Sequence, residues 1–192
     1  EEMKALAMQD SRTCISLYDA LKQDTLSVIS EVKKASPSKG LICQDFEPVS
    51  IALQYKKAGT NAISVLTEEH YFQGSSQYLT AIRQQIASIP ILRKDFIIEP
   101  YQIYEAKCIG ADAILLIATI LDTETLAQFR SIAHGLGLEC LAEVHNKEEL
   151  NRVLEVGFQI VGINNRNLKT FDVSLETTAQ LASYIPNECV IV

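Results

Sequence analysis

Short apolar runs alternate with segments of helical periodicity along most of this 192-residue chain. The runs are rich in β-branched residues and predict seven strands, at 28–32, 62–66, 89–92, 113–118, 138–144, 160–163 and 189–192. The segments between them predict helices at 49–58, 76–87, 101–109, 123–136, 147–156 and 175–184. Continuous apolar strands that alternate with helices are typical of a parallel sheet covered by crossover helices.

The predicted helix boundaries carry residues that favour them. Helices open at residues suited to a first turn or an N-cap, namely Pro48, Pro100, Asp122 and Asn146. Glycines, the usual left-handed residue at a helix end, follow four helices: Gly59, Gly110, Gly137 and Gly157. These residues at the helix ends support strand-plus-helix units, which form either a doubly wound sheet or a closed barrel.

The ends of four predicted strands favour the barrel. Each apolar run ends in charged or amide residues: Glu31 and Lys33, Lys94, Glu143, and Asn164 and Arg166. Such side chains converge readily from around a ring, and no G-x-G-x-x-G follows the first strand. We therefore predict an α/β fold, a (β/α)8 TIM barrel over 26–192, preceded by a helical extension over 1–25.

The strand count falls one short of that barrel. Only seven strands are predicted, and the sequence stops inside the seventh. A barrel without its eighth strand has an open edge, so we expect the end of strand 7 and strand 8 to lie in a longer polypeptide.

Composition narrows the class of protein. Apolar residues make up 47% and charged residues 21%, while the net charge of −7 argues against a nucleic-acid partner. No apolar stretch has the roughly 20 residues of a membrane span, and no signal peptide is visible. The five cysteines form no C-x-x-C pair, and the three histidines lack ligand spacing. We expect reduced thiols, a cytoplasmic location, no membrane partner and no metal.

The polar strand ends offer acid–base chemistry. Glu31 and Lys33 lie on one face of a strand, where they fit either an internal salt bridge or an anion site. The loop that follows carries Ser36 in a Ser-Pro-Ser-Lys-Gly sequence suited to a phosphate. Lys94 and Glu143 face inward on two other strands, as a general acid and a general base would.

Further residues complete the predicted pocket. Arg166 suits a planar carboxylate, and Asn164 can orient a hydroxyl or a carbonyl. Phe72, Phe96 and Leu115 lie near strand ends, where they fit either an apolar wall or ordinary core packing. The set predicts a dianionic substrate with a carboxylate, a phosphate and a flat part.

Five segments together resemble a known family. They read SEVKKASPSKG at 30–40, SVLTE at 64–68, LRKDF at 92–96, LAEVH at 141–145 and GINNRNL at 162–168. In this order the chain resembles indole-3-glycerol phosphate synthase over nearly its whole length. The resemblance implies a TIM barrel with an N-terminal extension, and a carbon–carbon lyase of tryptophan biosynthesis.

The family closes the indole ring of 1-(2-carboxyphenylamino)-1-deoxyribulose 5-phosphate and releases CO2 and water. The resemblance implies that Lys94 is the general acid of ring closure and Glu143 the general base of the later dehydration, although the acid role could divide between Lys94 and Lys33. It implies support from Glu31 and Asn164. The remaining implied roles are carboxylate binding by Lys33 and Arg166, phosphate binding by Ser36, and an aromatic-ring wall of Phe72, Phe96 and Leu115. No metal or organic cofactor is implied.

The sequence departs from the family pattern at its end. Family members continue past the seventh strand with Glu-Ser-Gly and a later glycine-rich stretch, which supply a polar pair and most of the phosphate cradle. Two alternatives stay open: a non-catalytic barrel fragment, and the front domain of a fused bifunctional enzyme. Another phosphate-binding barrel, such as the preceding isomerase, does not explain Lys33, Lys94 and Glu143 together with the Ser-Pro-Ser-Lys-Gly loop. Other tryptophan-pathway enzymes are possible partners.

Overall fold

Seven parallel strands form one curved sheet in the computed structural model, which describes residues 1–166 and 172–192. In sheet order they are β1 (Ile29–Val32), β4 (Ala62–Leu66), β5 (Ile91–Lys94), β6 (Ala113–Ile117), β7 (Glu139–Val144), β8 (Ile160–Ile163) and β9 (Val190–Ile191). The sheet order follows the chain order, as it does when each crossover has the same hand. The last two residues of the 162–168 segment, Asn167 and Leu168, lie outside the described residues.

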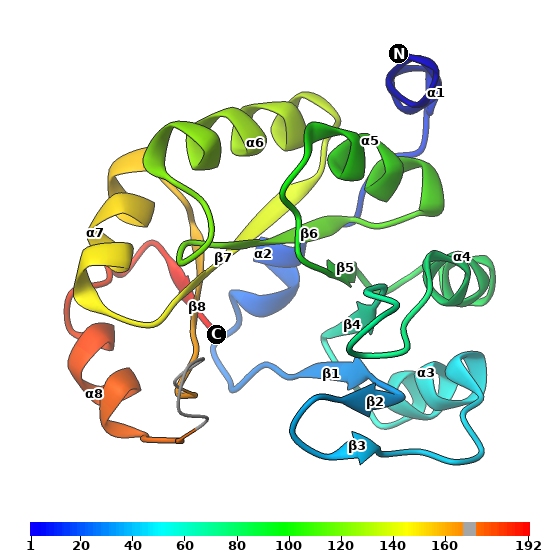
Figure 1. Cartoon of the computed structure of the whole chain (residues 1–192), viewed down its shortest axis with the longest axis horizontal. Helices are drawn as coiled ribbons and strands as arrows, with labels where there is room; N and C mark the ends of the chain where they lie inside the picture. Colours follow the sequence, from blue (N-terminus) through cyan, green and yellow to red (C-terminus); the bar gives the residue numbers. More distant parts are fainter. Residues whose placement is uncertain (167–171) are drawn as a thin grey trace.

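Helices follow the strands and pack on the outer side of the sheet (Figure 1). They are α3 (Pro48–Lys57), α4 (Ser76–Gln85), α5 (Pro100–Ile109), α6 (Thr123–Gly135), α7 (Lys147–Val156) and α8 (Glu176–Ala182). The side chains of Asp122 and Asn146 cap α6 and α7 by accepting backbone N–H bonds from Thr125 and Glu149. Gly110 and Gly157 end α5 and α7 with φ of 98° and 88°, the left-handed backbone that glycine adopts without strain.

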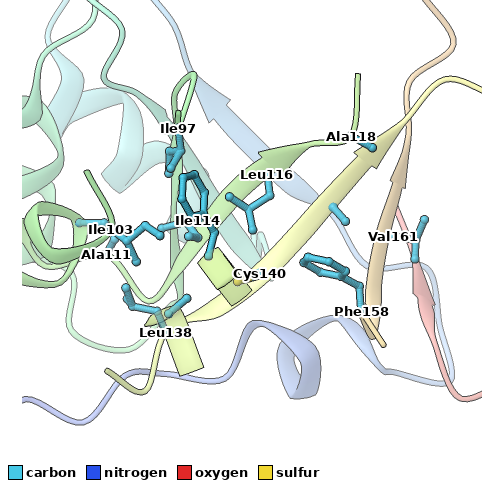
Figure 2. Close-up of a cluster of buried hydrophobic side chains, with 14 of the residues drawn as sticks. Ile97, Ile103, Ala111, Ile114, Leu116, Ala118, Leu138, Cys140, Phe158 and Val161 are labelled. Atoms are coloured by element: carbon cyan, nitrogen blue, oxygen red, sulfur yellow. The ribbon is translucent and has the colours of Figure 1, made fainter. Parts of the chain in front are cut away.

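The two faces of the sheet bury different sets of side chains. Along β6, Ile114 and Leu116 point outward into the layer between sheet and helices, where Cys140 and Phe158 also lie (Figure 2). The alternate residues Leu92, Leu115 and Leu141 form a separate cluster on the inner, concave face. These two clusters are what a curled sheet with helices on its outside requires. The predicted parallel α/β fold is thus confirmed as a seven-stranded, partly closed barrel.

Two helices precede the sheet, α1 (Glu2–Gln9) and α2 (Leu17–Leu21). Leu17 and Leu21 of α2 are buried in the inner cluster. Glu139, at the start of β7, fixes α2 by accepting hydrogen bonds from Ser16 Oγ at 2.9 Å and Tyr18 N at 2.7 Å. The helix therefore covers the end of the sheet at which the strands begin, opposite to the strand ends that carry the predicted site.

A buried ion cluster fastens the preceding segment to the sheet. Asp112, fully buried before β6, pairs with the guanidinium groups of Arg12 and Arg83. Its two oxygens also accept backbone N–H bonds from Ile15 at 3.0 Å and Ile91 at 2.8 Å. Burial lowers the pKa of Arg83, while the charge of Asp112 opposes that shift.

The structure corrects several predicted boundaries. The third strand was expected at 89–92 but spans Ile91–Lys94, because Pro90 lacks the N–H group that a ladder needs. The last predicted helix, 175–184, is shorter and spans Glu176–Ala182. The last strand is Val190–Ile191 rather than 189–192. The hairpin of β2 (Ala35–Ser36) and β3 (Gly40–Leu41) was not predicted, because the proline and glycine of that stretch indicated only a loop.

Candidate active site

A cavity of about 320 Å³ opens on the concave face, at the ends of the strands. Its polar lining comes from five strands or the residues next to them: Glu31, Ser64, Lys94, Glu143 and Asn164. Its apolar lining includes three leucines of the inner cluster: Leu92, Leu115 and Leu141. Five of the ten predicted site residues thus line one cavity, namely Glu31, Lys94, Leu115, Glu143 and Asn164.

The strand register explains why these residues meet. Glu31 pairs with Ser64 across β1 and β4, and Glu143 pairs with Gly162 across β7 and β8. Lys94 follows Leu92 by two residues, and both line the cavity as predicted. The intervening Arg93 points to the other face, where it pairs with Glu105 of α5 at 2.6 Å.

Glu31 lies between two ammonium groups. Its Oε1 accepts a 2.6 Å hydrogen bond from Lys33 Nζ, and its Oε2 lies 3.9 Å from Lys94 Nζ. Ser64 Oγ donates to Oε2 at 3.4 Å, which adds a neutral contact from the strand between them. The Lys94 and Glu31 side chains are each 29% exposed, so this charged group is open to the cavity. The geometry of Glu31 and Lys33 therefore fits both an internal salt bridge and an anion site.

Glu143 is held on the other side of the cavity. Its Oε1 accepts a 3.1 Å hydrogen bond from Asn164 Nδ2, and Asn164 Oδ1 in turn accepts the backbone N–H of Arg166 at 3.0 Å. The loop after β8 thereby fixes the amide that orients the carboxylate. His145 lies on the same side, with Nε2 3.5 Å from Glu143 Oε1.

The other predicted residues lie around the cavity rather than in its lining. Ser36 lies in β2, and the backbone N–H of the neighbouring Ala35 donates to Phe72 O at 3.3 Å. The rings of Phe72 and Phe96 contact each other, with centroids 6.3 Å apart. Arg166 is half-buried and pairs with Val173 through a backbone bridge. Lys33 does not line the cavity, but it bonds to Glu31, which does.

Sequence reasoning did not identify two polar residues of the site, Ser64 and His145. Ser64 is only 3% exposed inside an apolar strand, and a polar residue in such a run is the signal that could have identified it. Sequence reasoning assigned no role to His145, whose side chain is only 12% exposed and lies between two carboxylates.

Two negative findings apply to the described parts of the chain. No group of three His, Cys, Asp or Glu side chains in 1–166 and 172–192 is arranged to hold a metal ion. Within the same residues, no helix has the length and apolar character needed to cross a membrane.

Solved structures share the fold at low sequence identity. The N-acetylmannosamine-6-phosphate 2-epimerase of Clostridium perfringens aligns with a TM-score of 0.62 and 16% identity, over 93% of this chain and 80% of that one. A structure titled "Native KDPGal structure" aligns with a TM-score of 0.58, also at 16% identity. It covers 88% of this chain and 72% of the other. These likenesses concern the fold alone.

Sequence relatives are much more similar. Indole-3-glycerol phosphate synthases of Acetivibrio thermocellus and Lachnospira eligens are each 53% identical, over 93% and 98% of this chain. The one from Alkaliphilus metalliredigens is 54% identical over 88%. The matches cover 68%, 69% and 65% of these relatives. The family model for indole-3-glycerol phosphate synthase matches residues 1–192, and the chain belongs to that family.

Proposed function

We propose that this chain carries the acid–base machinery of an indole-3-glycerol phosphate synthase, a carboxy-lyase of tryptophan biosynthesis. The observation that supports it most is the pairing of Lys94 and Glu143 in one cavity, each held by a partner from a different strand. The substrate is the phosphorylated anthranilate derivative 1-(2-carboxyphenylamino)-1-deoxyribulose 5-phosphate, and the products are indole-3-glycerol phosphate, CO2 and water.

The first step joins two carbons. The ring carbon that bears the carboxylate attacks the substrate's ketone carbon, and Lys94 gives a proton to the ketone oxygen, which becomes a hydroxyl. The carboxylate then leaves as CO2, and the electrons of its bond restore the aromatic ring. An ammonium group near a carbonyl oxygen suits this step, and Glu31 keeps Lys94 turned into the cavity.

The second step removes water. The hydroxyl takes up a proton that is delivered from solvent and leaves as water, and Glu143 takes a proton from the carbon between the nitrogen and the former ketone. The electron pair of that C–H bond becomes the new double bond of the indole. Asn164 supports this role because its amide fixes the carboxylate oxygen Oε1 in the cavity.

The remaining predicted residues bind the substrate. Lys33 and Arg166 bind its carboxylate, and Ser36 in the hairpin after β1 binds its phosphate. Leu115 lines the cavity, and the contacting rings of Phe72 and Phe96 extend the apolar wall. No metal or organic cofactor enters this scheme, because proton transfers and decarboxylation account for all of its electrons.

The finer architecture is also a proposal. We assign 1–25 to a helical extension and 26–192 to a (β/α)8 barrel in which one more strand pairs between β9 and β1. The two edge strands support this, because a cavity of about 500 Å³ lies between them. Ile29 of β1 lines it on one side, and Val190, Ile191 and Val192 line it on the other. All five cysteines are free thiols, which supports a cytoplasmic location. Other tryptophan-pathway enzymes are possible partners.

The direct test is the appearance of indole fluorescence when the substrate is added. The assay requires a polypeptide with the full length of the relatives, because this chain corresponds to 65–69% of three of them. Turnover by the wild type supports the proposal. A well-folded protein of that length that binds the substrate and forms no product would refute it.

A further inference from the structure

His145 occupies a closed position behind the proposed base Glu143. It follows β7 by one residue, and its side chain is only 12% exposed. Its backbone N–H donates to Glu149 Oε2 at 2.7 Å, so the first turns of α7 hold the residue in place. The ring lies between Glu149 on one side and Glu143 on the other, at 3.2 and 3.5 Å.

The surroundings of Nδ1 determine where the ring carries its proton. Thr119 Oγ1 uses its only hydrogen to donate to Glu149 Oε1 at 2.9 Å, so it can only accept from Nδ1, which is 3.0 Å away. Glu149 Oε2, 3.2 Å from Nδ1, is also an acceptor. Two acceptors around Nδ1 place a proton on that nitrogen in the neutral ring.

The charge of Glu149 strengthens this assignment. Burial raises the pKa of Glu149, but hydrogen bonds from the His145 side chain, the His145 backbone and Thr119 outweigh it and lower the pKa overall. Asn146 Nδ2 adds a further bond to Oε1 at 3.0 Å. Glu149 is therefore a carboxylate, which cannot donate a proton to Nδ1.

The other ring nitrogen, Nε2, then carries a lone pair that faces Glu143. Nε2 is buried from water, and no hydrogen-bond partner reaches it in the described structure. Its nearest carboxylate oxygen is Glu143 Oε1 at 3.5 Å. Two facing acceptors have room for one proton between them, and such contacts commonly shorten when substrate binds.

We propose that His145 is a positioning residue that acts through Glu143, by sharing on Nε2 the proton that Glu143 removes from the substrate. This rests on the proposed dehydration role of Glu143. The substrate C–H bond breaks, its electron pair becomes the new double bond as the hydroxyl leaves, and the proton settles between Glu143 Oε1 and His145 Nε2 before it passes to water. The shared proton cannot readily return to carbon, which favours the forward reaction.

The charged groups around the ring come from several elements. Glu143 faces it from β7 and Glu149 from α7, while Thr119, after β6, is neutral. Asn164, after β8, is neutral and contacts the same Glu143 oxygen, and Lys94 of β5 lines the cavity beyond. The ring therefore lies between two carboxylates and beside one neutral hydroxyl.

The test compares His145→Gln with the wild type in a polypeptide of the relatives' full length. The glutamine amide can bond to Glu143 but cannot take up a proton. We expect kcat to fall about 10- to 100-fold with KM within about threefold. We also expect the acid limb of the kcat–pH profile to change, because one of the two proton-accepting groups is lost. His134→Gln, at the opposite end of the sheet, should change neither.

Two results would overturn the proposal. One is a fall in kcat with an unmoved acid limb, which a packing role alone would produce, and the other is unchanged kcat. A wild type without turnover would instead count against the proposed function. Nitrogen-15 spectra of the ring test the proton positions independently of turnover. They should show Nδ1 protonated and Nε2 bare in the neutral ring, with an altered Nε2 signal in Glu143→Gln. A neutral ring with its proton on Nε2, or an Nε2 signal unchanged in Glu143→Gln, would contradict the inference.

Discussion

Glu31 Oε2 lies 3.9 Å from Lys94 Nζ, although the two residues are separated by 63 positions and lie on strands that do not pair. The strand between them, β4, contributes Ser64, which donates to the same oxygen at 3.4 Å. The other oxygen of Glu31 binds Lys33 at 2.6 Å. One carboxylate thus compensates two ammonium groups at the cavity and sets their separation.

Replacing Glu31 by glutamine should therefore disturb the acid more than substrate binding. The amide has similar size but no charge to hold Lys94, so we expect kcat to fall about 10- to 100-fold and KM to change little. Steady-state indole fluorescence measures both. Glu148→Gln, an exposed change on α7, is the matched control and should be neutral. A Glu31→Gln variant with kcat within twofold of the wild type would contradict this role.

Lys33 and Arg166 should differ from Lys94 in the parameter they affect. If both bind the substrate carboxylate, Lys33→Met and Arg166→Met should each raise KM about 10- to 100-fold, since charge-assisted hydrogen bonds contribute roughly 1.5–3 kcal/mol. Their kcat should fall much less than that of Lys94→Met. Saturation curves of the three variants measure this split. A large loss of kcat in Lys33→Met at unchanged KM would transfer part of the acid role to Lys33.

The sequence predicted the inner face of the site well because strands alternate. Once Leu92 and Leu141 were assigned to the inside, Lys94 and Glu143 had to follow them there. Six of the seven strands also have bounds within one residue of the prediction at both ends, since most of their apolar runs end sharply at polar residues: β1, β4, β6, β7, β8 and β9. Local patterns of this kind need no knowledge of the rest of the chain.

Contacts between distant segments could not be predicted in the same way. The pairing of Asp112 with Arg12 and Arg83 joins residues about 100 and 29 positions apart, and no periodicity links them. The surroundings of His145 could not be predicted for a related reason, because its ring contacts Thr119 and Glu149 from other elements. The residue type alone gave it no role, and only the packed structure reveals its two carboxylate neighbours.

Removing the buried Asp112 carboxylate should destabilise the whole fold. Asp112→Ala leaves Arg83 buried without its partner and frees the backbone N–H groups of Ile15 and Ile91. Breaking a buried ion pair on one side costs about 3–5 kcal/mol, so the free energy of unfolding should fall by about that amount. Urea unfolding measures it, with the exposed Asp24→Ala expected within about 0.5 kcal/mol of the wild type. A loss below about 1 kcal/mol in Asp112→Ala would contradict the cluster's role.

Thiol labelling should separate the buried from the exposed cysteines. Burial raises the pKa of Cys140 to about 12, and its side chain lies in the layer between sheet and helices. Cys108 on α5 is exposed, so a maleimide at pH 8 should modify it in the folded protein. Cys140 should react only as the protein unfolds. Peptide mass spectrometry over time follows both, and equal rates without denaturant would contradict the packing described for β7.

The central claim is that Lys94 and Glu143 carry the proton transfers of indole ring formation. The most direct measurement is single-turnover indole fluorescence with Lys94→Met and Glu143→Gln in a polypeptide of the relatives' full length, at saturating substrate. We expect each rate to fall about 10²- to 10⁴-fold while substrate binding is kept, because each variant lacks one proton donor or acceptor. Near-normal rates in both variants would contradict the account.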